Sequence, residues 1–256
     1  MTIPIFDEPY FIPANTSSFL RSGETWIQNN QQFRQAQKYR FYRNAMDYIV
    51  ENDLKGSYFE FGVHRARTFT MIMSLDKFYA NHKGGTGGLL TPQEPGGGYM
   101  DRYVAFDSFE GFPPGTSVEA HPHYVEGHVK TDVARFQETL VKYGQTLDRV
   151  SIVKGFYSES LNEDLHLEFR KLQTKVCIAT FDCNLYESYK VALAFTDEYL
   201  QPGTVIYLDD YNTHRGQPTI GPKRAWLEYT KRSKWLFEPF LNVGWAGMSF
   251  ITCERS

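Results

Sequence analysis

Three aspartates are the residues of this chain best suited to chemistry. Asp182 follows one apolar, strand-like segment, and Asp209 and Asp210 together follow another. Adjacent carboxylates repel each other, so a pair at the end of an apolar strand needs a compensating partner. Oxygen ligands suit magnesium, and two successive residues reach one ion where a strand gives way to a loop. We therefore predict a divalent-cation site, with solvated turn carboxylates as the alternative.

Two further positions are suited to holding a ligand. Glu60 and Gly62 end a strand-like segment at 58–63, and Asp107 ends another at 103–106. Gly62 lets the backbone pass close to a ligand, at the carboxyl end of a strand where open α/β sheets bind ligands. Asp107 is placed to accept both ribose hydroxyls of an adenosine. The alternatives are a glycine needed only for the turn and an aspartate that caps the following turn.

The elements around these residues alternate between strand and helix. Such alternation is typical of an α/β fold with a doubly wound, Rossmann-like, mostly parallel sheet. The last apolar stretches, 234–241 and 248–252, favour an antiparallel closing hairpin, which Rossmann-type dehydrogenases usually lack. The expected strands are 58–63, 103–106, 150–153, 176–181 and 205–208, and the expected helices are 67–80, 132–144, 159–172 and 187–200.

The N-terminal part has a different pattern. Residues 25–52 carry apolar side chains near a 3.6-residue period, which predicts a helix. We expect one domain over 1–256, with an N-terminal helical cap at 1–55 and a cofactor-binding core at 56–256. The cap either covers the cleft or forms the interface of a homo-oligomer.

Composition excludes several partners. The net charge is −3 and the basic residues are spread along the 256-residue chain, which argues against nucleic acid as the partner. No run of about 18 apolar residues predicts a membrane span. Three cysteines without C-x-x-C spacing fit a reducing compartment, and no secretory signal is recognised. We expect a cytoplasmic protein that acts on a small molecule.

Two segments have ambiguous motifs. The Gly-rich stretch 82–98 lacks the Gly-Lys-Ser/Thr ending of a P-loop, so we interpret it as a flexible surface insertion. His121, His123 and His128 follow the second strand. They could bind zinc, but a polar loop over the substrate cleft is the favoured interpretation.

Taken together, these motifs resemble the macrocin O-methyltransferase family, bacterial enzymes that methylate sugar hydroxyls with S-adenosylmethionine and magnesium. The resemblance runs from about residue 40 to the end of the chain. The FDSFEGFP and LYES strings, in that order, are its most specific parts. The matching stretches are 59–63, 106–113, 182–188 and 208–211.

The resemblance implies a role for each group of residues. Glu60 and Gly62 would flank the methionine part of the cofactor, Asp107 would hold the ribose, and the segment 154–157 would lie near the adenine. The implied cofactor-binding residues are Glu60, Gly62, Asp107, Ser108, Gly155 and Phe156, and the implied metal ligands are Asp182, Asp209 and Asp210.

The chain departs from the family at two places. Residues 65–67 are Arg-Ala-Arg, where the family usually has small Gly-Gly residues. Asn184 stands where the family has the second Asp of a D-x-D pattern, which is thought to be the general base, and Asn accepts no proton at neutral pH. His64 and His214 are the nearest replacement bases in sequence, with structural or surface roles as the alternative for each.

The combined expectation is an S-adenosylmethionine-dependent O-methyltransferase that requires a divalent cation. Its acceptor would be a hydroxyl of a sugar or other natural product, and a vicinal diol fits because two neighbouring oxygens can chelate the ion. Asn184 keeps open a degenerate protein that binds the cofactor without catalysis. A different acceptor atom is a further alternative, and a nicotinamide-dependent oxidoreductase would need a full G-x-G-x-x-G motif.

Overall fold

The computed structural model describes residues 23–81, 98–116 and 124–255 of the 256-residue chain. Seven strands form a single sheet in the order β3-β2-β1-β4-β5-β7-β6. The first five strands run parallel, whereas β7 is antiparallel to both β5 and β6. The mostly parallel sheet and the antiparallel closing hairpin are therefore confirmed. The strands are β1 (Gly56–Phe61), β2 (Met100–Asp107), β3 (Val150–Lys154), β4 (Val176–Phe181), β5 (Val205–Leu208), β6 (Trp235–Val243) and β7 (Gly247–Glu254).

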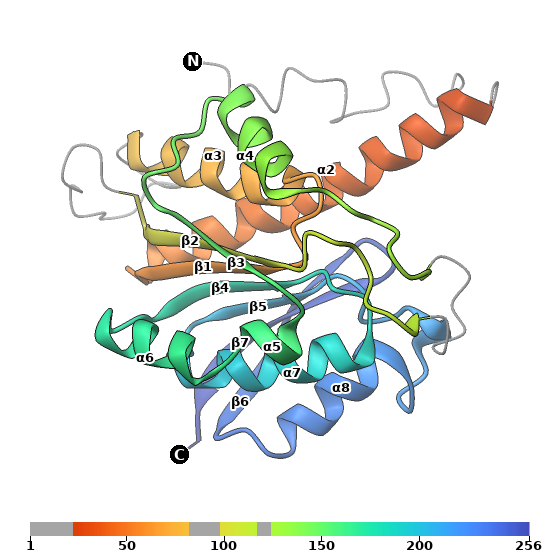
Figure 1. The fold of residues 1–256 in the computed structure, drawn as a ribbon. Helices are drawn as coiled ribbons and strands as arrows, with labels where there is room; N and C mark the ends of the chain where they lie inside the picture. Colours follow the sequence, from red (N-terminus) through yellow and green to blue (C-terminus); the bar gives the residue numbers. More distant parts are fainter. Residues whose placement is uncertain (1–22, 82–97, 117–123, 256) are drawn as a thin grey trace.

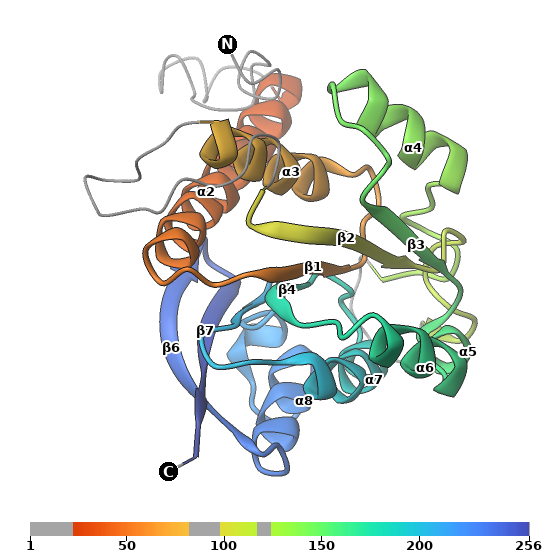
Figure 2. The ribbon, with the colours of Figure 1, turned by 90° about the vertical axis from the view of Figure 1, so that its left-hand side faces the viewer.

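Helices cover both faces of this sheet. Figures 1 and 2 show α2, α3 and α4 on one face and α5, α6, α7 and α8 on the other. The helices are α2 (Gly23–Glu51), α3 (Arg67–Asn81), α4 (Val133–Lys142), α5 (Tyr157–Ser160), α6 (Glu163–Lys171), α7 (Tyr186–Thr196) and α8 (Gly221–Thr230), with the short 3-10 helices η2 (Asp197–Tyr199) and η3 (His214–Gly216).

Two expected helices differ in detail from the observed ones. The helix expected at 159–172 is two helices, because Asn162 caps the start of α6 and accepts a hydrogen bond from the Leu165 amide at 3.1 Å. Such a cap satisfies an amide that has no partner within its helix. The helix expected at 187–200 ends as α7 at Thr196 and continues as η2.

The core lies on both faces of the sheet. Every residue of β1, β4 and β5 is buried, as expected for parallel strands covered by helices on both sides. One core cluster packs beneath α2, α3 and α4, and the other packs beneath α6, α7 and α8. Glu60 is the charged exception in β1, only 1% exposed.

The helical part of the expected cap is α2. Its buried face repeats at helical spacing through Phe41, Tyr42, Ala45, Met46, Ile49 and Val50. Hydroxyl groups join this face to the sheet. The Tyr42 hydroxyl lies 2.7 Å from Thr180 Oγ1 on β4 and 3.2 Å from the Tyr58 hydroxyl on β1. Residues 1–22 and the Gly-rich segment 82–97 lie outside the described residues.

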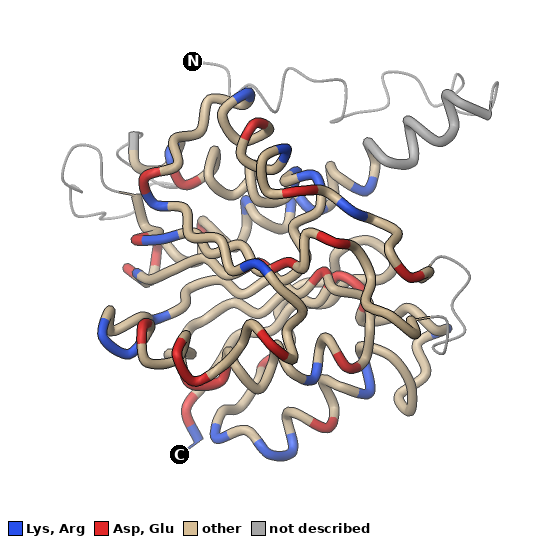
Figure 3. The backbone as a smooth tube through the Cα atoms, viewed as in Figure 1, with Lys and Arg blue, Asp and Glu red and all other residues tan. Residues whose placement is uncertain are grey.

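The distribution of charged residues and the character of the helices match what the sequence predicts. Basic and acidic residues are interspersed along the chain in Figure 3. Among the described helices, none combines the length and apolar character that a membrane crossing needs.

We predict that Tyr42→Phe lowers the free energy of unfolding by about 1 kcal/mol, because it removes a buried hydroxyl that contacts Thr180 and Tyr58. Chemical denaturation followed by circular dichroism measures the change. Tyr48→Phe is the matched control on the same helix, since Tyr48 is only partly buried and should change by less than about 0.5 kcal/mol. Equal effects of the two substitutions would contradict the role given to Tyr42.

Candidate functional site

The candidate site lies where the strand order of the sheet reverses. β1 and β4 are neighbours at this point, with β2 beyond one and β5 beyond the other. The Asp182 amide donates to the Phe61 carbonyl at 2.8 Å, and the Asp209 amide donates to the Phe181 carbonyl at 2.9 Å. The ends of β1, β4 and β5 are thereby held side by side. A topological switch point of this kind is where open α/β sheets bind their ligands.

Gly62 fixes the turn that leaves β1. Its φ is +89°, and a Cβ added there would lie 2.1 Å from the Asp182 carbonyl oxygen. A side chain is therefore excluded both by the backbone conformation and by the contact with the end of β4. The turn after β1 and the first acidic residue after β4 consequently touch through their backbones.

A cleft of about 740 Å³ opens over these strand ends. Its volume is in the range of small-molecule sites. The predicted cofactor residues all line it, together with two of the predicted metal ligands and Asn184. The lining residues of the predicted site are Glu60, Gly62, Asp107, Ser108, Gly155, Phe156, Asp182, Asn184 and Asp209.

Asp107 shapes the cleft from the end of β2. Its Oδ2 accepts hydrogen bonds from the amides of Val63 at 2.9 Å and His64 at 3.3 Å, and its Oδ1 accepts one from the Phe109 amide at 2.8 Å. The turn-capping role is therefore realised. An ionised carboxylate has about four acceptor positions, so this half-buried side chain keeps capacity for a ligand.

Glu60 brings a buried acidic group to the floor of the cleft. The Tyr58 hydroxyl donates to Glu60 Oε2 at 2.6 Å. Burial raises the pKa of Glu60 well above its ordinary value, although the Tyr58 hydrogen bond opposes this effect. A cationic group entering the cleft would relieve the cost of ionising Glu60.

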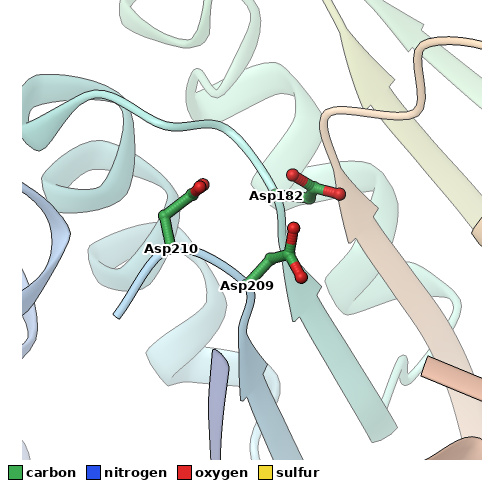
Figure 4. A group of neighbouring side chains, drawn as sticks. All are labelled: Asp182, Asp209 and Asp210. Carbon is green, nitrogen blue, oxygen red and sulfur yellow. The ribbon is translucent and has the colours of Figure 1, made fainter. Parts of the chain in front are cut away.

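The three predicted metal ligands converge. One oxygen of each of Asp182, Asp209 and Asp210 lies within 4.8 Å of the others. Figure 4 shows the carboxylates of Asp182 and Asp209 close together, with that of Asp210 beside them. Three hard oxygen donors suit a magnesium ion. The donor set and its convergence therefore fit a divalent cation.

A lysine that was not predicted from the sequence lies at this cluster. Lys38, on α2, places its Nζ 2.9 Å from Asp182 Oδ2 and 2.9 Å from Asp209 Oδ2. Burial lowers the pKa of Lys38, but the two carboxylates more than reverse this and raise it above its usual range. The signal in the sequence was a lysine at helical spacing with the apolar positions Phe41, Tyr42 and Ala45.

The three carboxylates have different proton affinities. Burial and the charge of Asp209 raise the pKa of Asp182 to about 6. Burial would also raise that of Asp209, but the Lys38 ammonium and the Tyr207 hydroxyl hold it below its ordinary value. Burial and both neighbouring carboxylates raise the pKa of Asp210 well above its usual range. The raised pKa values of Asp182 and Asp210 reflect the cost of ionising carboxylates so close together, a cost that a bound cation would lower.

Asn184 acts as a hydrogen-bond donor to this cluster. Its backbone amide donates to Asp210 Oδ2 at 3.2 Å, and its side-chain Nδ2 donates to Asp210 Oδ1 at 3.2 Å. Its φ of +61° is a left-handed conformation that Asn tolerates better than most residues. Asn184 thus orients Asp210, and its side-chain amide cannot take up a proton.

The histidines have different positions. His64 lines the cleft, and its Nδ1 lies 3.1 Å from both the Val129 carbonyl and Thr131 Oγ1. His214, in η3, is not among the cleft-lining residues of the described chain, and its ring lies 6.2 Å from that of Tyr124. His128 also lines the cleft, whereas His121 and His123 lie outside the described residues.

The Arg-Ala-Arg departure has a backbone cost. Ala66 has a φ of +58° and His64 a φ of +34°, a region that residues with a side chain adopt at a cost of about 1–2 kcal/mol. Ala66 is completely buried. The turn after β1 therefore keeps a glycine-like conformation without the glycine, and Arg65 and Arg67 both line the cleft.

The mostly parallel sheet with its antiparallel closing strands has a Rossmann-like methyltransferase architecture, with a cleft at its switch point. The model of the macrocin-O-methyltransferase (TylF) family matches residues 21–251. The chain therefore belongs to the macrocin-O-methyltransferase family, and it is an O-methyltransferase that uses S-adenosylmethionine.

Solved structures agree on the fold. The O-methyltransferase NovP superposes with a TM-score of 0.64 at 15% identity, over 86% of this chain and 81% of NovP. The calicheamicin methyltransferase CalS11 superposes with a TM-score of 0.61 at 19% identity, over 94% of this chain and 86% of CalS11. An O-methyltransferase from Bacillus cereus in complex with SAH gives 0.50 at 12% identity, over 93% and 95% of the two chains. Among curated proteins there is no significant match.

Proposed function

We propose that this enzyme methylates a hydroxyl of a sugar or sugar-bearing natural product, in a reaction that requires a divalent cation. The observation that carries this proposal is the convergence of Asp182, Asp209 and Asp210 beside the cleft. CalS11 is described as a TDP-rhamnose 3'-O-methyltransferase of calicheamicin biosynthesis, which supports a sugar acceptor.

In this proposal the cleft binds S-adenosylmethionine along the ends of β1, β2 and β3. Asp107 accepts hydrogen bonds from the ribose hydroxyls, and Ser108 lies beside it. Glu60 faces the ammonium of the methionine part, next to the backbone of Gly62. Gly155 and Phe156 flank the adenine. The sulfonium supplies an already activated methyl group, so these residues mainly align the reactants and exclude water.

The acidic cluster would hold the cation through Asp182, Asp209 and Asp210. A bound divalent ion lowers the pKa of a hydroxyl that coordinates it. A vicinal diol suits such a site because it offers two adjacent oxygens. Asn184 orients Asp210 through two hydrogen bonds, which keeps that carboxylate aimed at the cluster.

His64 is the favoured candidate for the group that takes the hydroxyl proton, since it lines the cleft whereas His214 is not among its described lining residues. Burial and the charge of Arg65 lower the pKa of His64, which keeps its ring neutral near pH 7. The Val129 carbonyl can only accept a hydrogen bond, so Nδ1 carries the proton and Nε2 is the basic nitrogen.

We expect Asp107→Ala to weaken S-adenosylhomocysteine binding by at least about tenfold, because a charge-assisted hydrogen bond to the ribose contributes about 1.5–3 kcal/mol. Isothermal titration calorimetry measures the affinity. Asp101→Ala is the matched control, since Asp101 is an exposed aspartate at the opposite end of β2. Wild-type affinity in folded Asp107→Ala protein would remove Asp107 from the cofactor site.

Removal of divalent ions with EDTA should abolish methyl transfer, and added magnesium should restore it, because the acceptor hydroxyl is a poor nucleophile without the ion. The assay measures S-adenosylhomocysteine formed with a panel of vicinal-diol sugars and the corresponding deoxysugars. S-adenosylhomocysteine binding, measured in parallel, should survive EDTA. Undiminished turnover in metal-free buffer would disprove metal dependence, and equal rates on deoxysugars would disprove the diol requirement.

His64→Gln should lower kcat by about 100-fold at pH 7, the scale of general base catalysis. Since the base must be unprotonated, wild-type kcat should fall as the pH drops through the lowered pKa of His64, below about 6.5, and this limb should be lost in the variant. His166→Gln, on α6 and away from the cleft, is the control. A wild-type rate and pH profile in His64→Gln would assign the proton to another acceptor.

A further inference from the structure

The cation at the acidic cluster is supplied by the protein itself. Lys38 is 8% exposed, and its ammonium bridges Asp182 Oδ2 and Asp209 Oδ2 at 2.9 Å each. These carboxylates follow two different strands, β4 and β5. An ammonium is a compact point charge with three donors. It therefore holds together two acidic groups that would otherwise repel each other.

The oxygens of Asp209 are both engaged. Oδ2 accepts from Lys38 and Oδ1 accepts from the Tyr207 hydroxyl. Each oxygen keeps a further acceptor position, but a divalent ion bound at Oδ2 would lie close to the Lys38 ammonium, and the two positive charges would repel each other. The ammonium is the partner that would remain beside the incoming ion with a charge of the same sign. Metal binding therefore destabilises the ion pair of Lys38 with Asp209 more than it destabilises the Tyr207 hydrogen bond.

A neighbouring hollow can receive the displaced side chain. A second cavity of about 360 Å³ shares Arg34, Lys38 and Asp209 with the main cleft. It lies between α2 and the turn that joins β6 to β7, where Gln37 and Trp245 line it. Four methylene groups allow the lysine to swing between the two spaces while its backbone stays in α2.

We propose that Lys38 is a built-in counter-cation that competes with the divalent ion for Asp182 and Asp209. In the metal-free protein Lys38 keeps the two carboxylates together and seats α2 over the cleft. Metal binding drives the ammonium away from Asp209 and weakens the contact between α2 and the ends of β4 and β5. Metal loading and the position of α2 are therefore linked. This inference rests on the metal site of the proposed function.

The test measures Mn²⁺ affinity from the electron paramagnetic resonance signal of the free ion. Lys38→Met should bind Mn²⁺ at least about tenfold more tightly than wild type, because the competing charge is removed. Lys38→Arg, which keeps the charge, should show no gain. Lys55→Met is the matched control on an exposed lysine and should bind like wild type.

The outcomes separate the two proposals. Tighter binding in Lys38→Met supports competition, including the case in which only that variant binds the ion. Wild-type binding with equal or weaker binding in Lys38→Met overturns the role of Lys38 and leaves the metal site intact. Absence of Mn²⁺ binding in both folded proteins overturns the metal site and the competition together.

A second measurement uses wild-type protein, so it does not require the Lys38 variants to fold. Reductive methylation by formaldehyde and a borane, read by mass spectrometry, reports how accessible each lysine amine is. Saturating Mg²⁺ should increase modification of Lys38 at least about threefold by displacing it from the ion pair, with Lys55 unchanged. Unchanged or reduced modification of Lys38, under conditions where Mn²⁺ binds, would refute the displacement.

Discussion

Mutual repulsion among buried carboxylates is the constraint on which this site depends. Four acidic side chains, Glu60, Asp182, Asp209 and Asp210, lie where the sheet order reverses. Glu60, Asp209 and Asp210 are buried, and Asp182 is partly exposed. Each has a named compensation: a tyrosine hydroxyl for Glu60, an ammonium for Asp182 and Asp209, and two amide donors for Asp210. Without these partners the strand ends would carry an uncompensated charge, which is far more costly than an exposed one.

The one positive charge among these compensations comes from the helix that precedes the sheet. α2 contributes Lys38 directly, and one turn later Tyr42 connects to the hydroxyl chain through Tyr58 that ends at Glu60. The helix is therefore part of the electrostatics of the site as well as a cover for one face of the sheet (Figure 1). This dual role explains why a charged residue occupies a position in the buried face of α2, where an apolar side chain would otherwise pack.

Much of the architecture was predictable, because local patterns encode it. Buried parallel strands appear as short apolar runs, and the residue that follows each run must lie at the carboxyl edge, so Asp182, Asp209 and Asp210 were expected at the same edge of the sheet. The structure adds that β4 and β5 are neighbours there. The split between α5 and α6 was missed because a single cap at Asn162 decided it. Lys38 was missed because its partners depend on how α2 is rotated and placed over β4 and β5, which no local pattern records.

The role of Asn184 shows a different limit of sequence reasoning. The residue type alone predicts that this position takes up no proton at neutral pH. It did not indicate that the amide would donate to Asp210 through both backbone and side chain. Such a replacement changes the sign of the interaction, since a carboxylate there would repel Asp210 whereas the amide attracts it.

The length of α2 has a mechanical consequence. The helix has 29 residues, and Gly23 lies about 22 Å along its axis from Lys38 at 1.5 Å per residue. A tilt of about 5° around Lys38 would displace the start of the helix by about 2 Å. If metal loading tilted α2 about Lys38, as the proposed competition allows, the start of the helix would therefore move much further than the ammonium itself.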